Sequence, residues 1–406
     1  MENVFTSSSP TGAATALAIE HRRPGPYQAA LLLAASCMSV LGAVLLAPVL
    51  PAMGAAFAET PGVGLMVPSV LTVPGLMMAL LSPLVGVVAD RLGRKKLLIG
   101  AMFFYAFAGT APLWLDSLQL ILLSRVGVGV SEAAIMTCCT TLLTDYYVGR
   151  EREKYLGMQV LVATLAATVF FLVGGALGSQ GWRTPFWLYT VGAVLGVLMV
   201  FGLLEPAKAR QFQGKLPVPW RQLAAPTLVT LFGGMVFYAL IVELPFVLTE
   251  LGVQDPGTLG MAAAIASLAT AAGAFSFRFL ARFGPAKVLP VSFGLAGAGL
   301  LVVWSASTMP AVMTGAVITS MGTGMLLPAL LTWAVSGLRF EQRGRGTGIW
   351  TGAVQLGQFA CPILLGIFAA SVGGLPTVLG ILGIFSALAA IVVAVARPKT
   401  HQEAEA

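Results

Sequence analysis

The chain has 406 residues, of which 57% are hydrophobic and only 10% are charged. Soluble domains carry about 25% charged residues, so the composition excludes a soluble fold and indicates an α-helical protein that crosses a membrane several times. The net charge of +7 would suggest nucleic-acid binding in a soluble protein, but here the position of the basic residues relative to the membrane explains it, and no nucleic-acid partner is expected.

The first 26 residues are polar and contain no apolar segment followed by a cleavage site, so no signal peptide is expected. Residues 1–26 are interpreted as a disordered cytoplasmic tail. The four cysteines, Cys37, Cys138, Cys139 and Cys361, all lie inside apolar runs and lack metal-ligand spacing. We interpret them as small packing residues and expect neither a metal site nor a disulfide framework.

Twelve apolar runs follow, each long enough to cross a bilayer as a helix of about 20 residues. The expected spans of the first half are residues 27–50, 63–89, 97–115, 118–144, 154–178 and 184–204. Those of the second half are residues 224–249, 258–281, 286–307, 310–336, 345–371 and 375–396. The proline-rich, basic residues 205–222 are expected to be a cytoplasmic linker between an N-terminal bundle (27–204) and a C-terminal bundle (223–396), and residues 397–406 a cytoplasmic tail.

The basic residues orient these spans. In the twelve-span arrangement, 21 of the 23 lysines and arginines fall on one side of the membrane, and only Arg125 and Arg183 do not. Loops rich in Lys and Arg stay in the cytoplasm. We therefore expect an integral protein of the plasma membrane, which is the inner membrane in bacteria, with both termini in the cytoplasm.

The segment between the second and third runs is a charged turn, Gly86-Val-Val-Ala-Asp90-Arg91-Leu-Gly93-Arg94-Lys-Lys. Its cations must lie at a membrane surface, and its glycines allow close helix approach and a tight reversal. The pattern resembles the signature loop of the major facilitator superfamily. The resemblance implies an all-α membrane protein with 12 transmembrane helices in two pseudo-symmetric six-helix bundles.

The same resemblance implies a secondary transporter that is not an enzyme, needs no cofactor, and works as a monomer in the lipid bilayer on small molecules and protons. It places Asp145, at the inner end of the fourth span, in a cytoplasmic gating network with Gly86, Asp90, Arg91, Gly93 and Arg94. That network would latch the two bundles in the outward-open state. The alternative is that the loop serves topology alone.

The fourth span carries two charged residues, Arg125 and Glu132, seven positions apart on one helix face. They are separated by about 10 Å along the axis, and because helical side chains lean toward the N-terminus, no direct bond is expected between them. Either would cost about 2.5–3.5 kcal/mol if it faced lipid. Both are therefore expected to face the interior of the bundle or a cavity.

This helix resembles the second motif of the superfamily, and its ending resembles the Spinster-like branch. The resemblance implies that Glu132 is a protonation site and Arg125 its electrostatic partner. The first span departs from that branch because it has no acidic residue between Tyr27 and Pro51. Glu132 is therefore left as the main group that could carry the proton. The alternative is a fixed ion pair that holds the helices together.

Three further polar residues lie at membrane depth. Glu243 is near the outer end of the seventh span, where it would line the cavity mouth as a second carboxylate or reach interfacial water. Gln355 and Gln358, in the eleventh span, would bind substrate or form hydrogen bonds between helices. Gly174 and Gly178 in the fifth span are spaced for close helix contact, in a stretch that partly resembles the antiporter motif of the superfamily.

An internal repeat supports two homologous halves. Arg91–Gly93 matches Arg282–Gly284, and Gly175 matches Gly366, each 191 positions apart. Parallel six-helix repeats are typical of facilitator transporters. In the second copy of the loop, Ala281 stands where the first copy has an aspartate.

The sequence therefore favours proton-coupled efflux, by antiport and alternating access, of amphipathic, drug-like or metabolite small molecules, as in multidrug resistance. The alternative is Spinster-like transport of a lipid-related or small organic molecule, including uptake. A membrane-embedded enzyme or sensor is disfavoured because the sequence has no histidine cluster, metal spacing or phosphate loop.

Overall fold

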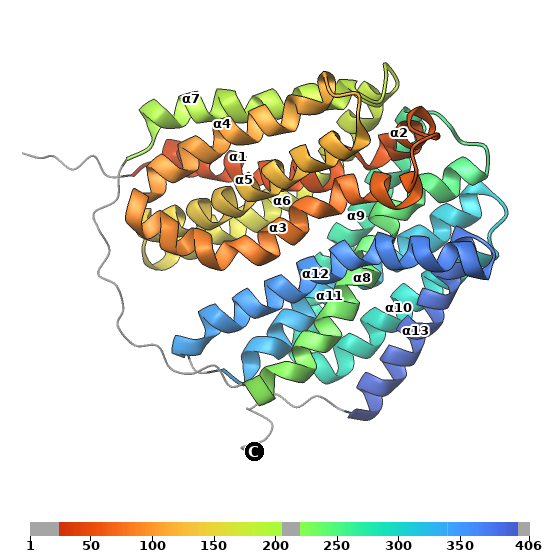
Figure 1. Ribbon diagram of the computed structural model, residues 1–406. Coiled ribbons are helices and arrows are strands. Elements are labelled where there is room, and N and C mark those ends of the chain that lie inside the picture. Colours follow the sequence, from red (N-terminus) through yellow and green to blue (C-terminus); the bar gives the residue numbers. More distant parts are fainter. Residues whose placement is uncertain (1–23, 205–219, 339, 397–406) are drawn as a thin grey trace, which may run out of the picture.

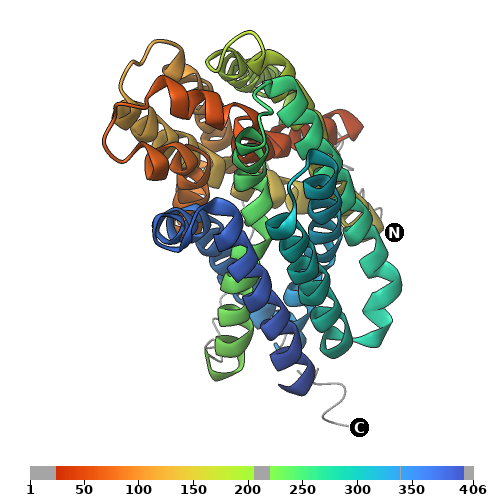
Figure 2. The same cartoon turned by 90° about the vertical axis from the view of Figure 1, so that its right-hand side faces the viewer.

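A computed structural model of the protein describes residues 24–204, 220–338 and 340–396. The predicted tails, 1–26 and 397–406, and the predicted linker, 205–222, lie almost entirely outside these residues. The described chain is helical nearly throughout, and its two halves lie side by side (Figure 1). Seen from the right-hand side of Figure 1, the first half is gathered at the top and the second half lies below it (Figure 2).

The helices of each half follow the predicted runs closely. The first half contains α1 (Pro26–Val44), η1 (Ala47–Val49), α2 (Leu50–Ala56), α3 (Val63–Leu92), α4 (Arg94–Thr110), η2 (Ala111–Leu113), α5 (Leu118–Tyr146), α6 (Gly149–Gly178), η3 (Thr184–Tyr189) and α7 (Thr190–Gly202). The second half contains α8 (Trp220–Glu250), α9 (Pro256–Leu280), η4 (Ala281–Phe283), α10 (Pro285–Ser305), α11 (Met309–Ser336), α12 (Phe340–Val372) and α13 (Leu375–Ala396).

Twelve helical segments among the described residues are long and apolar enough to cross a membrane, which confirms the predicted number of spans. The first of them runs through α1, η1 and α2, from Pro26 to Ala56. Pro48 and Pro51 stand at the starts of η1 and α2, where a proline, which has no N–H to donate, ends the preceding regular turn.

The charged segment after the second span is more helical than the predicted turn. Helix α3 continues to Leu92, so Asp90 and Arg91 lie in its last turn, and the single residue Gly93 separates it from α4. Gly93 has φ +89°, and Gly284, its counterpart in the second half, has φ +73°. Only glycine adopts such a conformation without strain, so the repeat extends to the backbone of the two turns.

The two ends of the helical bundle differ in charge. The basic end is the one where α3 gives way to α4 and α9 to α10; it carries Arg91, Lys96, Arg282 and Lys287. At the opposite end α6 finishes and α9 begins. Helices α3 and α12 lie close together toward the opposite end and diverge toward the basic end (Figure 1).

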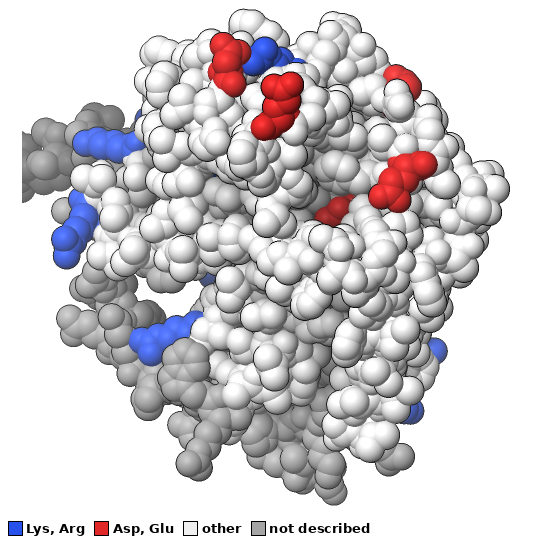
Figure 3. Space-filling model, turned by 45° about the vertical axis from the view of Figure 1, so that its right-hand side comes forward, with Lys and Arg blue, Asp and Glu red and all other residues white. Residues whose placement is uncertain are grey.

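At the opposite end the halves meet along a seam between α6 and α9. A Cβ atom added to Gly260 would lie 2.6 Å from the carbonyl oxygen of Phe171 and 2.8 Å from the Cα of Gly175. The backbones of the two halves are thus in direct contact there. Figure 3 shows a hollow between the halves at the left of the view, with Lys and Arg on its rim. The structure is therefore closed at the opposite end and open toward the basic end.

The seam predicts the effect of one added side chain. Gly260→Val should force α6 and α9 apart at the opposite end, because a Cβ cannot approach backbone atoms to less than about 3 Å without displacing them. Spin labels attached at Gln180→Cys and Gln254→Cys, beside the seam, should then lie farther apart. Double electron–electron resonance spectroscopy measures the distance between the two labels.

The matched control is Gly64→Val at the same end of α3, where an added Cβ would meet no atom within 4 Å. An unchanged label distance in Gly260→Val would contradict the close seam.

Candidate functional site

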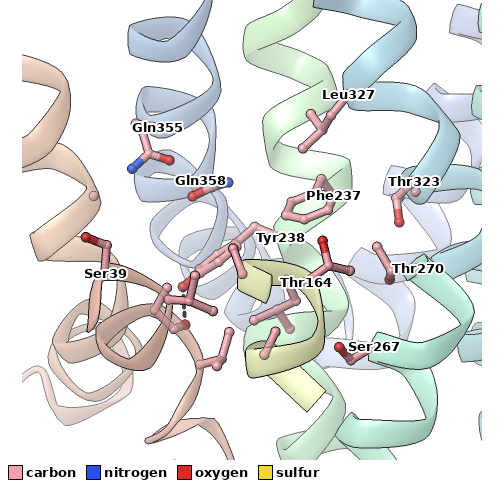
Figure 4. Close-up of a pocket in the computed structure, with 18 of the residues that line it drawn as sticks. Ser39, Thr164, Phe237, Tyr238, Ser267, Thr270, Thr323, Leu327, Gln355 and Gln358 are labelled. Atoms are coloured by element: carbon pink, nitrogen blue, oxygen red, sulfur yellow. Dashed lines mark hydrogen bonds between the residues drawn. The ribbon is translucent and has the colours of Figure 1, made fainter. Parts of the chain in front are cut away.

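A cavity of about 600 Å³ lies between the two halves. Helices α1, α3, α5 and α6 line it from the first half, and α8, α9, α11 and α12 from the second. Its walls are mostly aliphatic and aromatic, with hydroxyl and amide side chains placed among them (Figure 4). Such a concave apolar site with a few polar groups is typical of small-molecule binding.

Glu132 is the only carboxylate among the described residues that line this cavity, and none of them is a lysine, arginine or histidine. It lies halfway along the 29-residue helix α5 and is 2% exposed. Its Oε1 has no hydrogen-bond partner within the described ranges. Gly42 of α1 lies against it, and a Cβ at that position would overlap Oε1. The glycine therefore provides the space that the carboxylate occupies.

Arg125, seven residues before Glu132 on the same helix, is fully buried. One Nη donates to the carbonyl oxygens of Ala108 and Gly109, each at 3.0 Å. The guanidinium carbon lies 5.2 Å from the ring centre of Phe186 and 5.1 Å from that of Tyr189. Backbone carbonyls and ring faces thus replace much of its hydration, although its second Nη makes no hydrogen bond to any residue that the structure describes.

No ion pair joins Arg125 to Glu132 among the described residues, as the helix geometry predicts. Both side chains are buried inside the first half, so the prediction that they avoid lipid is confirmed. Arg125 does not line the cavity. It acts on Glu132 only through the intervening low-dielectric interior. Whether the pair couples transport to protons stays a prediction.

Tyr238 of α8 links the two halves beside this carboxylate. Its hydroxyl donates to the carbonyl oxygen of Ala43 at 2.7 Å (Figure 4). Ala43 directly follows Gly42, which touches Glu132. A side chain of the second half is therefore hydrogen-bonded to the segment of α1 that packs against Glu132.

Gln355 and Gln358 of α12 both line the cavity, as one of their predicted roles requires. The amide nitrogen of Gln355 lies 3.9 Å from the sulfur of Met78 on α3, so this contact joins the two halves through α12 and α3. Gln358 makes no hydrogen bond among the described residues, so its amide is available to a ligand. Figure 4 shows both amides on α12 facing the cavity side of that helix.

Glu243 is placed differently from the predicted cavity mouth. It is 4% exposed, does not line the cavity, and makes no hydrogen bond or ion pair among the described residues. In this conformation its side chain is therefore buried in the interior of the protein and does not face the cavity. Its predicted part in the substrate cavity stays a prediction that concerns other conformations.

The predicted gating residues meet at the basic end. Arg94 forms ion pairs with Asp145 and with Asp90, the latter at 3.2 Å. Lys95 donates to the carbonyl oxygens of Val200 and Leu203 at 3.1 and 2.6 Å. All these partners belong to the first half. In the present conformation the network therefore joins α3, α4, α5 and α7, and its predicted role as a latch between the halves stays untested.

Gly86 and Arg91 belong to the same predicted network. An added Cβ at Gly86 would meet no atom within 4 Å, and Arg91 is exposed. No hydrogen bond or ion pair joins either residue to the second half within the described ranges, which fits a structure that is open at this end.

A polar contact does join the halves at the opposite end. Ser179 donates to Asp255 at 3.0 Å, and the hydroxyl and backbone N–H of Thr258 donate to the same carboxylate at 2.8 Å each. The hydrogen bonds from Thr258, followed by that from Ser179, lower the pKa of Asp255 below its usual range. The carboxylate stays charged from neutral to mildly acidic pH, so this contact is not a pH switch in that range.

Sequence reasoning did not assign a role to several residues in or beside the cavity. Gly42 and Tyr238 carried no distinguishing motif, because their roles depend on how helices pack. Thr323 could have been found, since it stands 191 positions after Glu132 and the repeat predicts equivalent places. It lines the cavity from α11. The second half thus presents a neutral hydroxyl where the first half presents the carboxylate.

Comparisons with known proteins identify the fold and its relatives. The family model of the Major Facilitator Superfamily matches residues 32–280 and 227–406. The multidrug efflux protein YfmO of Bacillus subtilis is 26% identical over 377 residues, covering 86% of this chain and 90% of that protein. Protein spinster homolog 1 of Bos taurus is 29% identical over 124 residues, covering 30% of this chain and 23% of that protein.

The fold matches a solved structure. The crystal structure of a bacterial homologue of the human lysosomal transporter Spinster, inward-facing and unoccupied, aligns with a TM-score of 0.71 at 18% identity. The alignment covers 92% of this chain and 96% of that one.

The contact between Gly42 and Glu132 makes a prediction about stability. Gly42→Ala should lower the unfolding free energy by about 1–3 kcal/mol, the usual cost of overpacking a tight interior. In a Glu132→Ala background the same substitution should cost little, because the overlapping carboxylate is gone. Thermal unfolding of the four proteins of this double-mutant cycle in detergent measures the coupling.

Gly54→Ala provides the control, because an added Cβ there would meet no atom within 4 Å. Equal losses from Gly42→Ala in both backgrounds would show that the two residues do not touch.

Proposed function

The chain belongs to the Major Facilitator Superfamily, and from that premise we propose that it exports amphipathic or drug-like small molecules in exchange for protons. It is a membrane transporter of small molecules and not an enzyme. The observation that carries the proposal is the carboxylate of Glu132, the one charged group among the described residues that line the cavity between the two halves.

Competition at Glu132 would supply the coupling. An ionised carboxylate in an apolar cavity is costly unless a cation pairs with it. A lipophilic cation or a proton can each satisfy that requirement, but both cannot do so at once. Binding of one therefore promotes release of the other, which is the linkage that an antiporter needs.

Alternating access would deliver each ligand to the correct side. We propose that the protein lies in the plasma membrane, the inner membrane of a bacterium, as a monomer with both termini in the cytoplasm. The basic end is then cytoplasmic, and the present structure is inward-facing. Rocking of the halves would open the α6–α9 seam and close the basic end, where Asp90, Arg91 and Arg94 would meet the second half.

The polar residues of the second half would orient the substrate. Gln358 offers an amide that makes no hydrogen bond to any described residue, and Thr323 offers a hydroxyl at the position equivalent to Glu132. Gln355 contacts Met78 weakly and can turn toward a ligand. These groups can donate or accept hydrogen bonds without imposing a charge, which suits varied amphipathic compounds.

A second candidate function is Spinster-like transport of a lipid-related or small organic molecule. The resemblance of α5 to the Spinster-like branch and the similarity to protein spinster homolog 1 favour it. This function would use the same cavity, but recognition of the substrate would not depend on the proton gradient.

The decisive variant is Glu132→Gln, which keeps the shape of the side chain and removes its charge. In liposomes with an imposed pH gradient, the rate of gradient-driven movement of tetraphenylphosphonium should fall at least about tenfold. A tenfold effect corresponds to a free-energy difference of only ~1.4 kcal/mol. Glu59→Gln, which removes an exposed carboxylate, is the matched control and should transport normally.

Equal transport by the parent and Glu132→Gln would contradict the assignment of Glu132. Movement of a lysophospholipid that is indifferent to the gradient and to this substitution, without movement of the cation, would support the Spinster-like alternative.

A further inference from the structure

A second hollow lies on the outer surface of the first half, away from the transport cavity. It has a volume of about 420 Å³ and is formed by the end of α3, the first half of α4 and the middle of α5. Lys96 stands at its basic end and Phe104 lies deepest along α4. We call it the α4–α5 groove.

The floor of the groove is open because Gly100 has no side chain. A Cβ added there would meet no atom within 4 Å. Val130, Ser131 and Ala134 of α5 form the other wall. The hydroxyl of Ser131 already donates to the carbonyl oxygen of Gly127 at 3.0 Å. Below Lys96 the groove therefore offers an apolar surface with its one hydroxyl satisfied.

The cations at the mouth of the groove differ in their partners. Arg94 is paired with Asp90 and Asp145, and Lys95 is bound to two backbone carbonyls of the α7 end. Lys96 is exposed, and among the described residues its ammonium group makes no hydrogen bond or ion pair. An unpaired cation thus remains above an apolar groove.

The dimensions fit one lipid chain. From Lys96 to Phe104 the groove extends along eight residues of α4, or about 12 Å. Half of the hydrocarbon core of a bilayer is about 15 Å thick. A headgroup at Lys96 would therefore allow most of one acyl chain to follow the groove into the membrane.

The second half does not repeat this arrangement. Lys287 stands 191 positions after Lys96, but Val291 occupies the place equivalent to Gly100. At Gly322, the equivalent of Ser131, an added Cβ would lie 2.6 Å from the backbone nitrogen of Ala296 and 2.7 Å from the carbonyl oxygen of Ser292. There α10 and α11 are in backbone contact. The groove is specific to the first half, although the lysine is shared.

We propose that the α4–α5 groove binds one acidic phospholipid, whose phosphate pairs with Lys96 and whose acyl chain covers Gly100 and Phe104. Basic residues at the cytoplasmic ends of membrane helices favour anionic lipids. The chain of this lipid lies against Val130 and Ser131, directly behind Glu132 on α5. The bound lipid thereby supports, from outside the bundle, the helix segment that carries the buried carboxylate.

Native mass spectrometry of the delipidated full-length protein tests this site with dioleoylphosphatidylglycerol and dioleoylphosphatidylcholine. The parent should bind one phosphatidylglycerol in preference to phosphatidylcholine. Lys96→Gln should reduce that preference about fivefold, the effect of one basic residue near the surface. Gly100→Leu should weaken binding of either lipid at this site by filling the groove, and it replaces a helix-disfavouring residue with a favourable one.

Lys287→Gln is the matched control and should leave the preference unchanged. Equal losses in Lys96→Gln and Lys287→Gln would show a general effect of surface charge and overturn the proposal. Equal binding of the two lipids by the parent would overturn it as well. The result is independent of transport, because lipid binding is measured without substrate or a pH gradient.

Discussion

The structure depends on a buried carboxylate, one oxygen of which has no hydrogen-bond partner in the part of the chain that the structure describes. Glu132 lies at the midpoint of a membrane-spanning helix, is nearly inaccessible, and faces a cavity between the two halves. Placing an acid there is unfavourable unless something that enters the cavity compensates it. Gly42 leaves room for it, and Arg125 is held apart from it by carbonyl oxygens and aromatic rings. No fixed ion pair compensates Glu132 among the described residues, and we propose that a ligand or a proton does so.

The two halves share a backbone plan but divide the chemistry. The first half supplies the carboxylate of Glu132 to the cavity, whereas the second half supplies Thr323, Gln355 and Gln358. Arg125 and the ion pairs around Arg94 also belong to the first half but lie outside the cavity. Tyr238 connects the two through its hydrogen bond to Ala43. Movement of the second half therefore acts on the α1 backbone next to Glu132. This gives a direct physical route from the relative position of the halves to the environment of the acid.

Much of this fold could be predicted from the sequence, because a bilayer restricts the chain to long apolar helices and basic loops. The twelve spans and the burial of Arg125 and Glu132 follow from that restriction, and the repeat of 191 positions is visible in the sequence itself. The arrangement around Glu132 could not be predicted, since the roles of Gly42 and Tyr238 arise from contacts between helices distant in sequence. The charged segment was predicted as a turn, but the helical hydrogen bonds of α3 continue to Leu92 and leave only Gly93 outside a helix. A buried carboxylate at membrane depth suggested that Glu243 lines the cavity, but the packing of its helix places it outside the lining.

The central claim is that a cation and a proton compete for Glu132. Calorimetric titration of the purified protein with tetraphenylphosphonium, in buffers of different ionisation enthalpy, counts the protons released on binding. The account predicts release of up to about one proton per bound cation by the parent, increasing as the pH is lowered toward the range where Glu132 is protonated, and none by Glu132→Gln. The same proton release by both proteins, or binding with no release at any pH, would contradict it.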